Sequence, residues 1–239
     1  MGRAFEVRKV AMAKTNAAKS KIYAKYGKEI YMAAKSGSPD PETNQALKRV
    51  IEKAKKEQVT ADVIKRAIDK AKGGSDENYT SARYEGFGPG NSLFIIECLT
   101  DNVNRTIAEV RNCFTKTGGK LGISGSVVHQ FNHFSVFTLP EVTEDEILEI
   151  LVMNDVDVSD IETDEVGVTI YGTADDYNAI RTAVLEANPD IEFETEEIMW
   201  LPIMETTIDS DDQKEAFDKL MQMLDEIDDV QDVYHNVAL

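Results

Sequence analysis

The spacing of hydrophobic residues changes near residue 80, and this change limits the possible folds more than any other feature of the sequence. Before residue 80 the apolar positions recur at steps of three and four, as in Ile22, Tyr26, Ile30 and Ala33, which is the period of an α-helix. After residue 80, short apolar runs such as Ser92–Leu99 alternate with helical segments. We therefore expect an α+β protein whose N-terminal region is helical.

Three helices are predicted in the N-terminal region. The first covers Lys19–Gly37, where a Ser-Gly-Ser-Pro sequence ends it. Asp40 is expected to cap the second helix, with Pro41 at its first helical position. Thr60 is expected to cap the third. The three helices form a small bundle, and Gly73–Ser81 is the expected linker to the rest of the chain.

The rest of the chain predicts two units of the order β-α-β-β-α-β, which is the ferredoxin-like arrangement. In one of them, strands are expected at Ser92–Leu99, Ser126–Phe131, Leu201–Ile208 and Gln231–Val237. The sequence thus predicts three domains. They are a basic helical domain at residues 1–78, a discontinuous ferredoxin-like domain at residues 79–133 and 203–239, and a second ferredoxin-like domain inserted at residues 134–202.

Positive and negative charges are separated along the chain. The net charge is −18, but residues 1–74 hold 18 basic against 8 acidic residues, a net charge of +10. The remainder holds 8 basic against 36 acidic residues, a net charge of −28. Because physiological salt screens charges over about 8 Å, the basic region can bind a polyanion despite the overall sign. The acidic body would repel that polyanion, so we expect binding on one face.

Lysines follow one face of the first predicted helix. Residues 1–35 carry nine basic and two acidic side chains, a net charge of +7. Cations in a row suit phosphate binding, which releases counterions and depends strongly on salt. A solvated helix face without a ligand is the alternative, and Tyr23, Tyr26 and Tyr31 either stack on bases or pack in the core. The predicted nucleic-acid contacts are Arg8, Lys9, Lys14, Lys19, Lys21, Lys25, Lys28 and Lys35.

Two glycine clusters provide further candidate binding loops. Glycines allow backbone amides to approach a phosphate closely, although tight turns beside strands explain the same residues equally well. Neither cluster matches a phosphate-loop motif. The candidate loop residues are Gly86, Gly88, Gly90, Arg105, Gly118, Gly119 and Lys120.

Catalytic and metal-binding patterns are weak. His129 and His133 could share a strand face, but no carboxylate or cysteine cluster accompanies them. Two cysteines provide no disulfide framework. Cys98 lies in a hydrophobic run and Cys113 in a helical pattern, so both are expected to be buried thiols. We therefore expect a protein that is not an enzyme, with no catalytic residue, no metal and no cofactor.

The sequence also indicates a location and a second kind of partner. No apolar stretch approaches the ~20 residues that span a bilayer, and the opening lacks a signal-peptide pattern, so we expect a cytoplasmic protein without membrane contact. The acidic run Asp209–Asp232 has hydrophobic residues at helical spacing. It is interpreted as the solvent face of an amphipathic helix, or as a surface for a protein partner.

Long stretches of the sequence resemble the YebC/PmpR family, and the resemblance is closest to its YeeN-like branch. It covers roughly residues 19–135, although the opening Met1–Glu6 differs from the His-Ser-Lys-Trp-like start common in the family. The matching strings are Lys21–Lys35, Asp40-Pro41-Glu42, Ile51–Lys55, RYEGFGPG at Arg83–Gly90, ECLTDNVNRT at Glu97–Thr106, EVRNCF at Glu109–Phe114 and GGKLGISGSV at Gly118–Val127.

The resemblance implies three domains, a cytoplasmic location and a regulator of gene expression that binds DNA. It also leaves open a translational activator that acts at the ribosome and relieves stalling on proline-rich stretches. No helix-turn-helix recognition helix is identified, so sequence-specific reading of bases is not predicted. A third hypothesis is a small-molecule sensor, because paired ferredoxin-like domains can bind ligands between them.

Overall fold

The computed structural model describes residues 19–73 and 78–238. The chain divides into two compact units. One unit contains the helical N-terminal region up to Val127 together with Ile208–Val233. The other contains Val128–Thr207 and the segment from Tyr234 onward.

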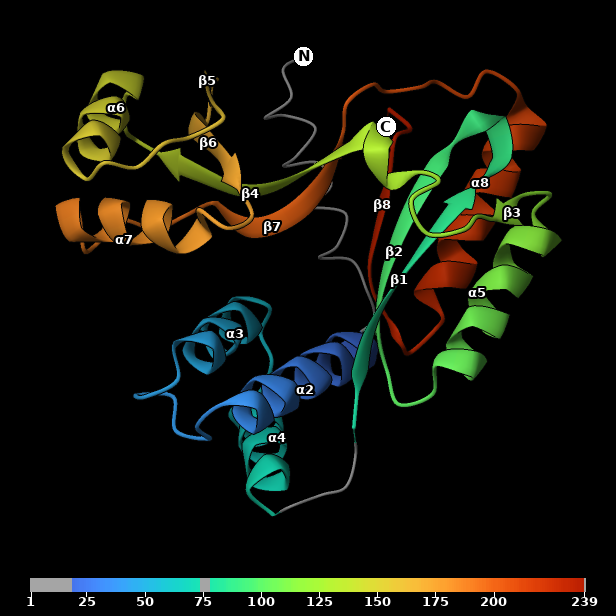
Figure 1. The fold of residues 1–239 in the computed structure, drawn as a ribbon, viewed down its shortest axis with the longest axis horizontal. Helices are drawn as coiled ribbons and strands as arrows, with labels where there is room; N and C mark the ends of the chain where they lie inside the picture. The colour runs from blue at the N-terminus through green and yellow to red at the C-terminus, as the bar shows by residue number, and fades with distance from the viewer. Residues whose placement is uncertain (1–18, 74–77, 239) are drawn as a thin grey trace. The chain divides into compact units, whose positions relative to one another are not determined.

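The N-terminal region contains the three predicted helices (Figure 1). They are α2 (Lys19–Ser36), α3 (Gln45–Lys56) and α4 (Ala61–Lys72). Their buried side chains form a core of their own, which includes Ile30, Leu47, Ile51 and Ile64. The amphipathic period of the sequence is therefore sufficient to explain this region.

The predicted cap of the second helix is wrong. Asn44 caps α3, and its side-chain oxygen accepts a hydrogen bond from the backbone N–H of Leu47 at 3.0 Å. The amide of Asn44 also donates to the carbonyl oxygens of Ala33 and Ser38, so it joins the end of α2 to the start of α3. The carboxylate of Asp40 instead accepts from the N–H of Glu42 in the turn before α3.

The first sheet has the strand order β3-β1-β2-β8. Its strands are β1 (Thr80–Phe87), β2 (Leu93–Thr100), β3 (Lys120–Leu121) and β8 (Val230–His235), and its helices are α5 (Val103–Lys116) and α8 (Asp211–Asp225). β1 and β2 form an antiparallel hairpin, which a 3-10 turn at Pro89–Asn91 closes. The first sheet thus combines three strands that precede residue 131 with one strand that follows residue 202. The domain boundaries and the insertion of residues 134–202 stay predictions.

Two predicted strands of the first sheet are wrong. Within Ser126–Phe131 the chain forms a 3-10 turn at Val128–Gln130. Within Leu201–Ile208, a strand of the second sheet ends at Pro202, and after it only Thr206 forms an isolated bridge, to Val237. Two observed strands were not predicted: the two-residue β3, and β1, which the glycine-rich string at Arg83–Gly90 concealed. Gly86 interrupts the apolar pattern because the ring of Phe114 packs against it, where a Cβ would lie 2.3 Å from the ring.

The second sheet has the predicted element order β-α-β-β-α-β. It contains β4 (Phe131–Pro140), α6 (Glu144–Met153), β5 (Asp160–Thr163), β6 (Gly167–Thr173), α7 (Tyr177–Ala187) and β7 (Thr195–Pro202). The strand order is β5-β6-β4-β7, and each neighbouring pair is antiparallel. The side chains of α6 and α7 that face the sheet form one core with Phe137, Leu139 and Ile170.

Candidate nucleic-acid interface

Three lysines of α2 form ion pairs with carboxylates at the end of α8, in the turn that follows it and in β8. The Nζ atom of Lys25 lies 3.0 Å from Oδ1 of Asp232, and that of Lys28 lies 2.9 Å from Oδ1 of Asp229. Lys21 pairs with Asp225 in the same way. We call Lys21, Lys25 and Lys28 the lysine stripe, and Asp225–Asp232 the acidic segment.

The lysine stripe is largely removed from solvent. Its three side chains are only 15–23% exposed, and each ammonium group also donates to a backbone carbonyl of the acidic segment. The prediction that the stripe presents a row of ammonium groups to solvent is therefore wrong. The acidic run of the sequence is likewise not only a solvent face, because part of it contacts α2.

Asp229 is the centre of this contact. Its side chain is 5% exposed, and its Oδ2 atom accepts hydrogen bonds from the hydroxyls of Thr100 and Thr106, both at 2.8 Å, and from Arg105 at 2.6 Å. Burial alone would raise the pKa of this carboxyl, but hydrogen bonds from Lys28, Arg105 and the two threonines outweigh burial and hold the pKa well below its usual range. Asp229 is therefore ionised at neutral pH.

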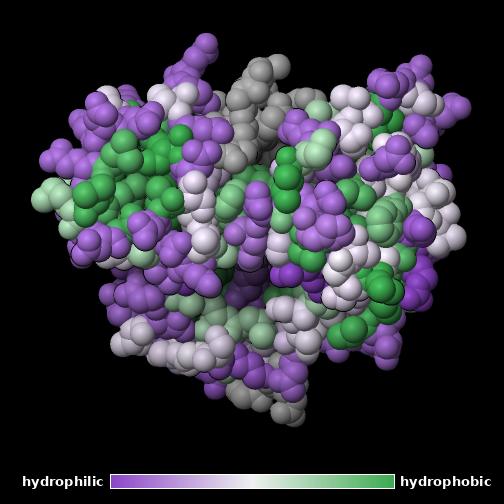
Figure 2. All heavy atoms as spheres, turned by 45° about the horizontal axis from the view of Figure 1, so that its top comes forward, coloured by the Kyte–Doolittle hydropathy of each residue, from purple (hydrophilic) through white to green (hydrophobic). Residues whose placement is uncertain are grey.

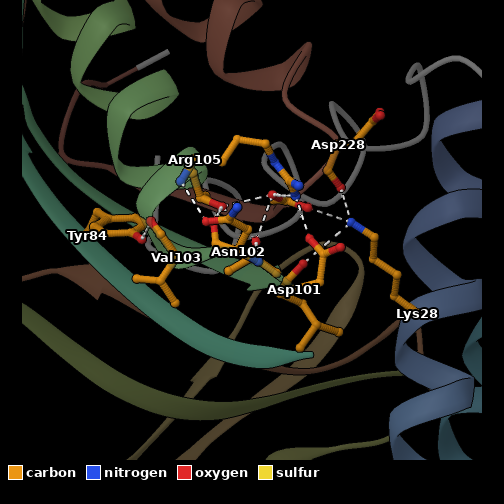
Figure 3. Close-up of polar contacts among 11 residues, drawn as sticks. Lys28, Tyr84, Asp101, Asn102, Val103, Arg105 and Asp228 are labelled. Carbon is orange, nitrogen blue, oxygen red and sulfur yellow. Dashed lines mark hydrogen bonds and ion pairs between the residues drawn. The ribbon is translucent and has the colours of Figure 1, made fainter. Parts of the chain in front are cut away.

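The charges around Asp229 come from three elements. Figure 3 shows Lys28 reaching from α2 toward Asp228, while Asp101 and Arg105 lie at the start of α5. The guanidinium of Arg105 bridges Asp101 at 2.7 Å and Asp229 at 2.6 Å. Arg105, a predicted loop contact, is thus held by carboxylates of its own chain.

The other predicted contacts of the first helix divide into two groups. Lys35 is exposed, and its ammonium group donates to the hydroxyl of Tyr31 at 3.1 Å and to the side-chain oxygen of Asn78 at 2.9 Å. The side chains of Arg8, Lys9, Lys14 and Lys19 lie outside the part of the chain whose side chains the structure describes.

The tyrosines between these lysines pack within the protein. Tyr31 is 2% exposed and meets Tyr79 edge to face, with 5.8 Å between the ring centroids. Tyr23 and Tyr26 pack against the core of the helical region. Of the two interpretations of these residues, core packing is the one the structure supports.

The two other helices of this region carry cations that the sequence analysis did not select. Lys55, Lys65 and Lys72 line an open groove of about 590 Å³ between α3 and α4. Apolar side chains, including Ile51, Ile64 and Ile68, also line it, together with Asp40 and Asp69. We call this feature the α3–α4 groove. The exposed cations of the two helices are Lys48, Lys55, Lys56, Lys65, Arg66, Lys70 and Lys72.

A signal for these cations was present in the sequence. Residues 45–72 hold nine basic against four acidic residues, a net charge of +5. The cations belong to two helices, so no single helical stripe reveals them. Only the packing of α3 and α4 on α2 places three of them around one groove.

The glycine clusters have packing roles in the structure. A Cβ at Gly119 would lie 2.6 Å from the carbonyl oxygen of Phe87, and one at Gly88 would lie 2.5 Å from the ring of Phe94. Gly90 and Gly118 adopt positive φ values of 66° and 77°, which other residues rarely do. The ammonium group of Lys120 lies 5.2 Å from the centroid of the Phe87 ring. Phosphate binding by these loops stays a prediction.

A buried carboxylate holds the loop that follows β3. Glu85 on β1 is 4% exposed and accepts hydrogen bonds from the backbone N–H groups of Gly125 at 2.6 Å and Val127 at 2.5 Å. Each of these bonds satisfies an amide that the loop's own backbone leaves unpaired. The carboxylate therefore fixes the path of the glycine-rich loop.

Replacing Glu85 with glutamine is expected to lower the free energy of unfolding by about 1–3 kcal/mol, because one of the two backbone amides then faces an NH2 donor and the other keeps only a neutral acceptor. Urea unfolding at neutral pH measures this change. Glu109→Gln, which neutralises an exposed carboxylate on α5, is the control and is expected to have little effect. Equal stabilities of the two variants would contradict the proposed role of Glu85.

Within the described residues, no group of three or more His, Cys, Asp or Glu side chains could hold a metal ion. His133 stacks on Trp200, with 4.2 Å between the ring centroids. Both cysteines are buried, and burial raises the pKa of the Cys98 thiol to about 12. In the same part of the chain, no helix combines the length and the apolar character needed to cross a membrane.

Together these features define an α+β protein in which a helical region with exposed cations precedes two acidic, four-stranded antiparallel sheets. The chain belongs to the TACO1/YebC family. The model of the family's N-terminal domain matches residues 3–74, and the model of its second and third domains matches residues 79–237.

Relatives of the chain agree with this assignment over their whole length. A "Probable transcriptional regulatory protein" of Acholeplasma laidlawii is 61% identical and covers 99% of this chain and 98% of its own. A protein of the same description from Alteromonas mediterranea is 56% identical over 100% of this chain and 99% of its own. These names describe regulatory proteins, not enzymes.

A solved structure shares the fold. The crystal structure of a conserved hypothetical protein from Aquifex aeolicus matches with a TM-score of 0.76 at 35% sequence identity. The match covers 95% of this chain and 93% of the other.

Proposed function

We propose that this chain is a cytoplasmic regulator of gene expression that binds nucleic acid through its helical N-terminal region, and that it is a DNA-binding transcriptional regulatory protein. The names of its relatives support the regulatory role. The observation that carries the binding role is the exposed set of cations on α3 and α4, in a protein whose net charge is −18.

The phosphate contacts assigned by this proposal are Lys55, Lys65 and Lys72 of the α3–α4 groove. Arg8, Lys9, Lys14, Lys19 and Lys35 of the sequence prediction remain further proposed contacts. The lysine stripe is left out because carboxylates of the chain already occupy it. In this proposal, residues 134–202 form an inserted domain, and the two sheets serve as scaffold and partner surface.

Structured RNA in the ribosome is the second candidate ligand. The groove carries lysines, which suit phosphate groups, and the described residues that line it include no arginine, asparagine or glutamine to read base edges. Contacts to phosphates alone do not distinguish DNA from RNA. In this alternative the chain is a translational activator that relieves stalling on proline-rich stretches.

The experiment is a titration of the full-length protein with a DNA duplex and with a structured RNA over a range of salt concentrations. Each phosphate contact contributes about 0.9 to the slope of log affinity against log salt for duplex DNA. The variant K55Q/K65Q/K72Q is therefore expected to bind more weakly and to lower the slope by about 2–3.

A matched variant separates the groove from overall charge. K116Q/K214Q/K219Q neutralises three exposed lysines of α5 and α8 and changes the net charge by the same amount. Its slope is expected to equal that of the wild type. Equal slopes for both triple variants would contradict the assignment of the groove, and no measurable binding of either ligand by the wild type would contradict the proposed function itself.

A further inference from the structure

Helix α6 exposes a group of large apolar side chains. Leu148, Val152 and Met153 are 40%, 73% and 77% exposed. Figure 2 shows hydrophobic residues gathered at the left of the view, over the part that carries α6 and α7 in Figure 1. We call these three side chains the α6 patch.

The side chains of the α6 patch are not part of the core that packs against the second sheet. Ile147 and Leu151 of the same helix are buried, at 0% and 2% exposure, and they anchor α6 to the core. Leu148 and Val152 are four residues apart, so they lie together on the outer side of the helix. A helix at the surface of a protein usually has polar residues on that side. α6 therefore carries a second apolar face with no partner among the described residues.

Carboxylates surround the α6 patch. Helical spacing places Glu144 and Asp145 beside Leu148, and it places Glu149 beside Val152 and Met153. All three carboxylate side chains are exposed. The apolar stripe is thus bordered by negative charge along the helix.

The rest of this region has almost no positive charge. Residues 134–202 contain 19 acidic residues and one basic residue, a net charge of −18. The single basic residue is Arg181, whose Nε atom lies 2.7 Å from the carboxylate of Glu196. A ligand that approaches the α6 patch therefore meets a negative potential with little to offset it.

We propose that the α6 patch is a docking surface for a basic amphipathic helix of a protein partner. Such a helix offers an apolar stripe to Leu148, Val152 and Met153, and its flanking lysines or arginines meet Glu144, Asp145 and Glu149. Nucleic acid does not fit, because its phosphates are repelled by the same carboxylates. A second copy of this patch does not fit either, because two acidic surfaces would face each other.

The test uses two synthetic 14-residue peptides made only of leucine and lysine. In the first, the leucines recur at steps of three and four to form one helical face. The second has the same composition in scrambled order. The full-length protein is expected to bind the amphipathic peptide at least about tenfold more tightly than the scrambled one, because only the first presents a continuous apolar stripe.

Variants locate the binding surface. V152S/M153S is expected to abolish the preference for the amphipathic peptide, and D145N/E149Q is expected to weaken its binding. I123S changes an apolar side chain that is 81% exposed in the loop after β3, and E186Q/D190N neutralises two exposed carboxylates elsewhere in residues 134–202. Both control variants are expected to bind like the wild type.

Three results would overturn the proposal. Equal binding of the two peptides would mean that charge alone attracts them. A preference that survives in V152S/M153S would place the docking surface elsewhere. Concentration-dependent self-association of the wild type, lost in V152S/M153S, would make the α6 patch an interface between copies of this chain.

Discussion

Replacing Asp229 with asparagine is expected to lower the free energy of unfolding by about 3–5 kcal/mol, because it leaves Lys28 and Arg105 without the buried carboxylate between them. Thr100 and Thr106 also lose their charged acceptor. Urea unfolding at pH 7 measures the change. Asp225→Asn is the matched control, since the side chain of Asp225 is 63% exposed and its pair with Lys21 is expected to contribute at most about 1 kcal/mol.

The pH dependence of this effect follows from the lowered pKa of Asp229. A carboxyl whose pKa is lower in the folded than in the unfolded state stabilises the fold fully above the unfolded-state pKa, about 3.9, and this contribution is lost as the pH falls below that value. The stability difference between the wild type and Asp229→Asn is thus expected to shrink between pH 5 and pH 3. Burial lowers the pKa of His235 to about 4, but His235 titrates in both proteins and cancels in the difference. A difference that stays constant over this range would contradict the account.

Replacing Lys28 with methionine is expected to lower the free energy of unfolding by about 2–4 kcal/mol, because the hydrogen-bonded carboxylate of Asp229 stays buried and loses one of its two cations. Lys21→Met removes a lysine from the same stripe, but its partner is largely exposed, so a loss of at most about 1 kcal/mol is expected. Denaturant unfolding of both variants measures how the loss of unfolding free energy differs between the two positions of the lysine stripe. Equal losses of unfolding free energy would mean that burial of the partner carboxylate does not change the contribution of the ion pair to stability.

A double-mutant cycle isolates the pair itself. Lys28→Met, Asp229→Asn and their combination give a coupling free energy that excludes effects of each substitution alone. Because Lys28 and Asp229 are in direct contact at 2.9 Å, the combined variant is expected to lose less stability than the two single losses added together. Additive losses would contradict direct coupling.

The parts of the fold that local hydrophobic periodicity determines could be predicted from the sequence. The expected helix Lys19–Gly37 is observed as Lys19–Ser36, and the helices and strands of the second sheet follow one another along the chain in the predicted order. Errors arose where tertiary contacts decide the local structure. Gly86 lies inside β1 because the ring of Phe114 needs the space, and Asn44 caps α3 because its amide also reaches the end of α2. Neither contact can be inferred from spacing along the chain.

The site could be predicted less well, for the same physical reason. Helical spacing correctly places Lys21, Lys25 and Lys28 on one face, but it does not reveal what that face contacts. Their partner carboxylates lie 204, 207 and 201 residues further along the chain. The lysines of the α3–α4 groove were missed because two helices must pack together before their cations share a surface.

We propose that the acidic segment occupies the lysine stripe, while the lysines of the α3–α4 groove are available to nucleic acid. Reductive methylation of the full-length protein, followed by mass spectrometry of each lysine, tests this claim with and without a DNA duplex or structured RNA. In the free protein, Lys55, Lys65 and Lys72 are predicted to react quickly and Lys21, Lys25 and Lys28 slowly. Of these six lysines, only Lys55, Lys65 and Lys72 are predicted to gain protection from the ligand. Fast reaction of Lys21, Lys25 and Lys28 in the free protein, with protection when nucleic acid binds, would contradict the account.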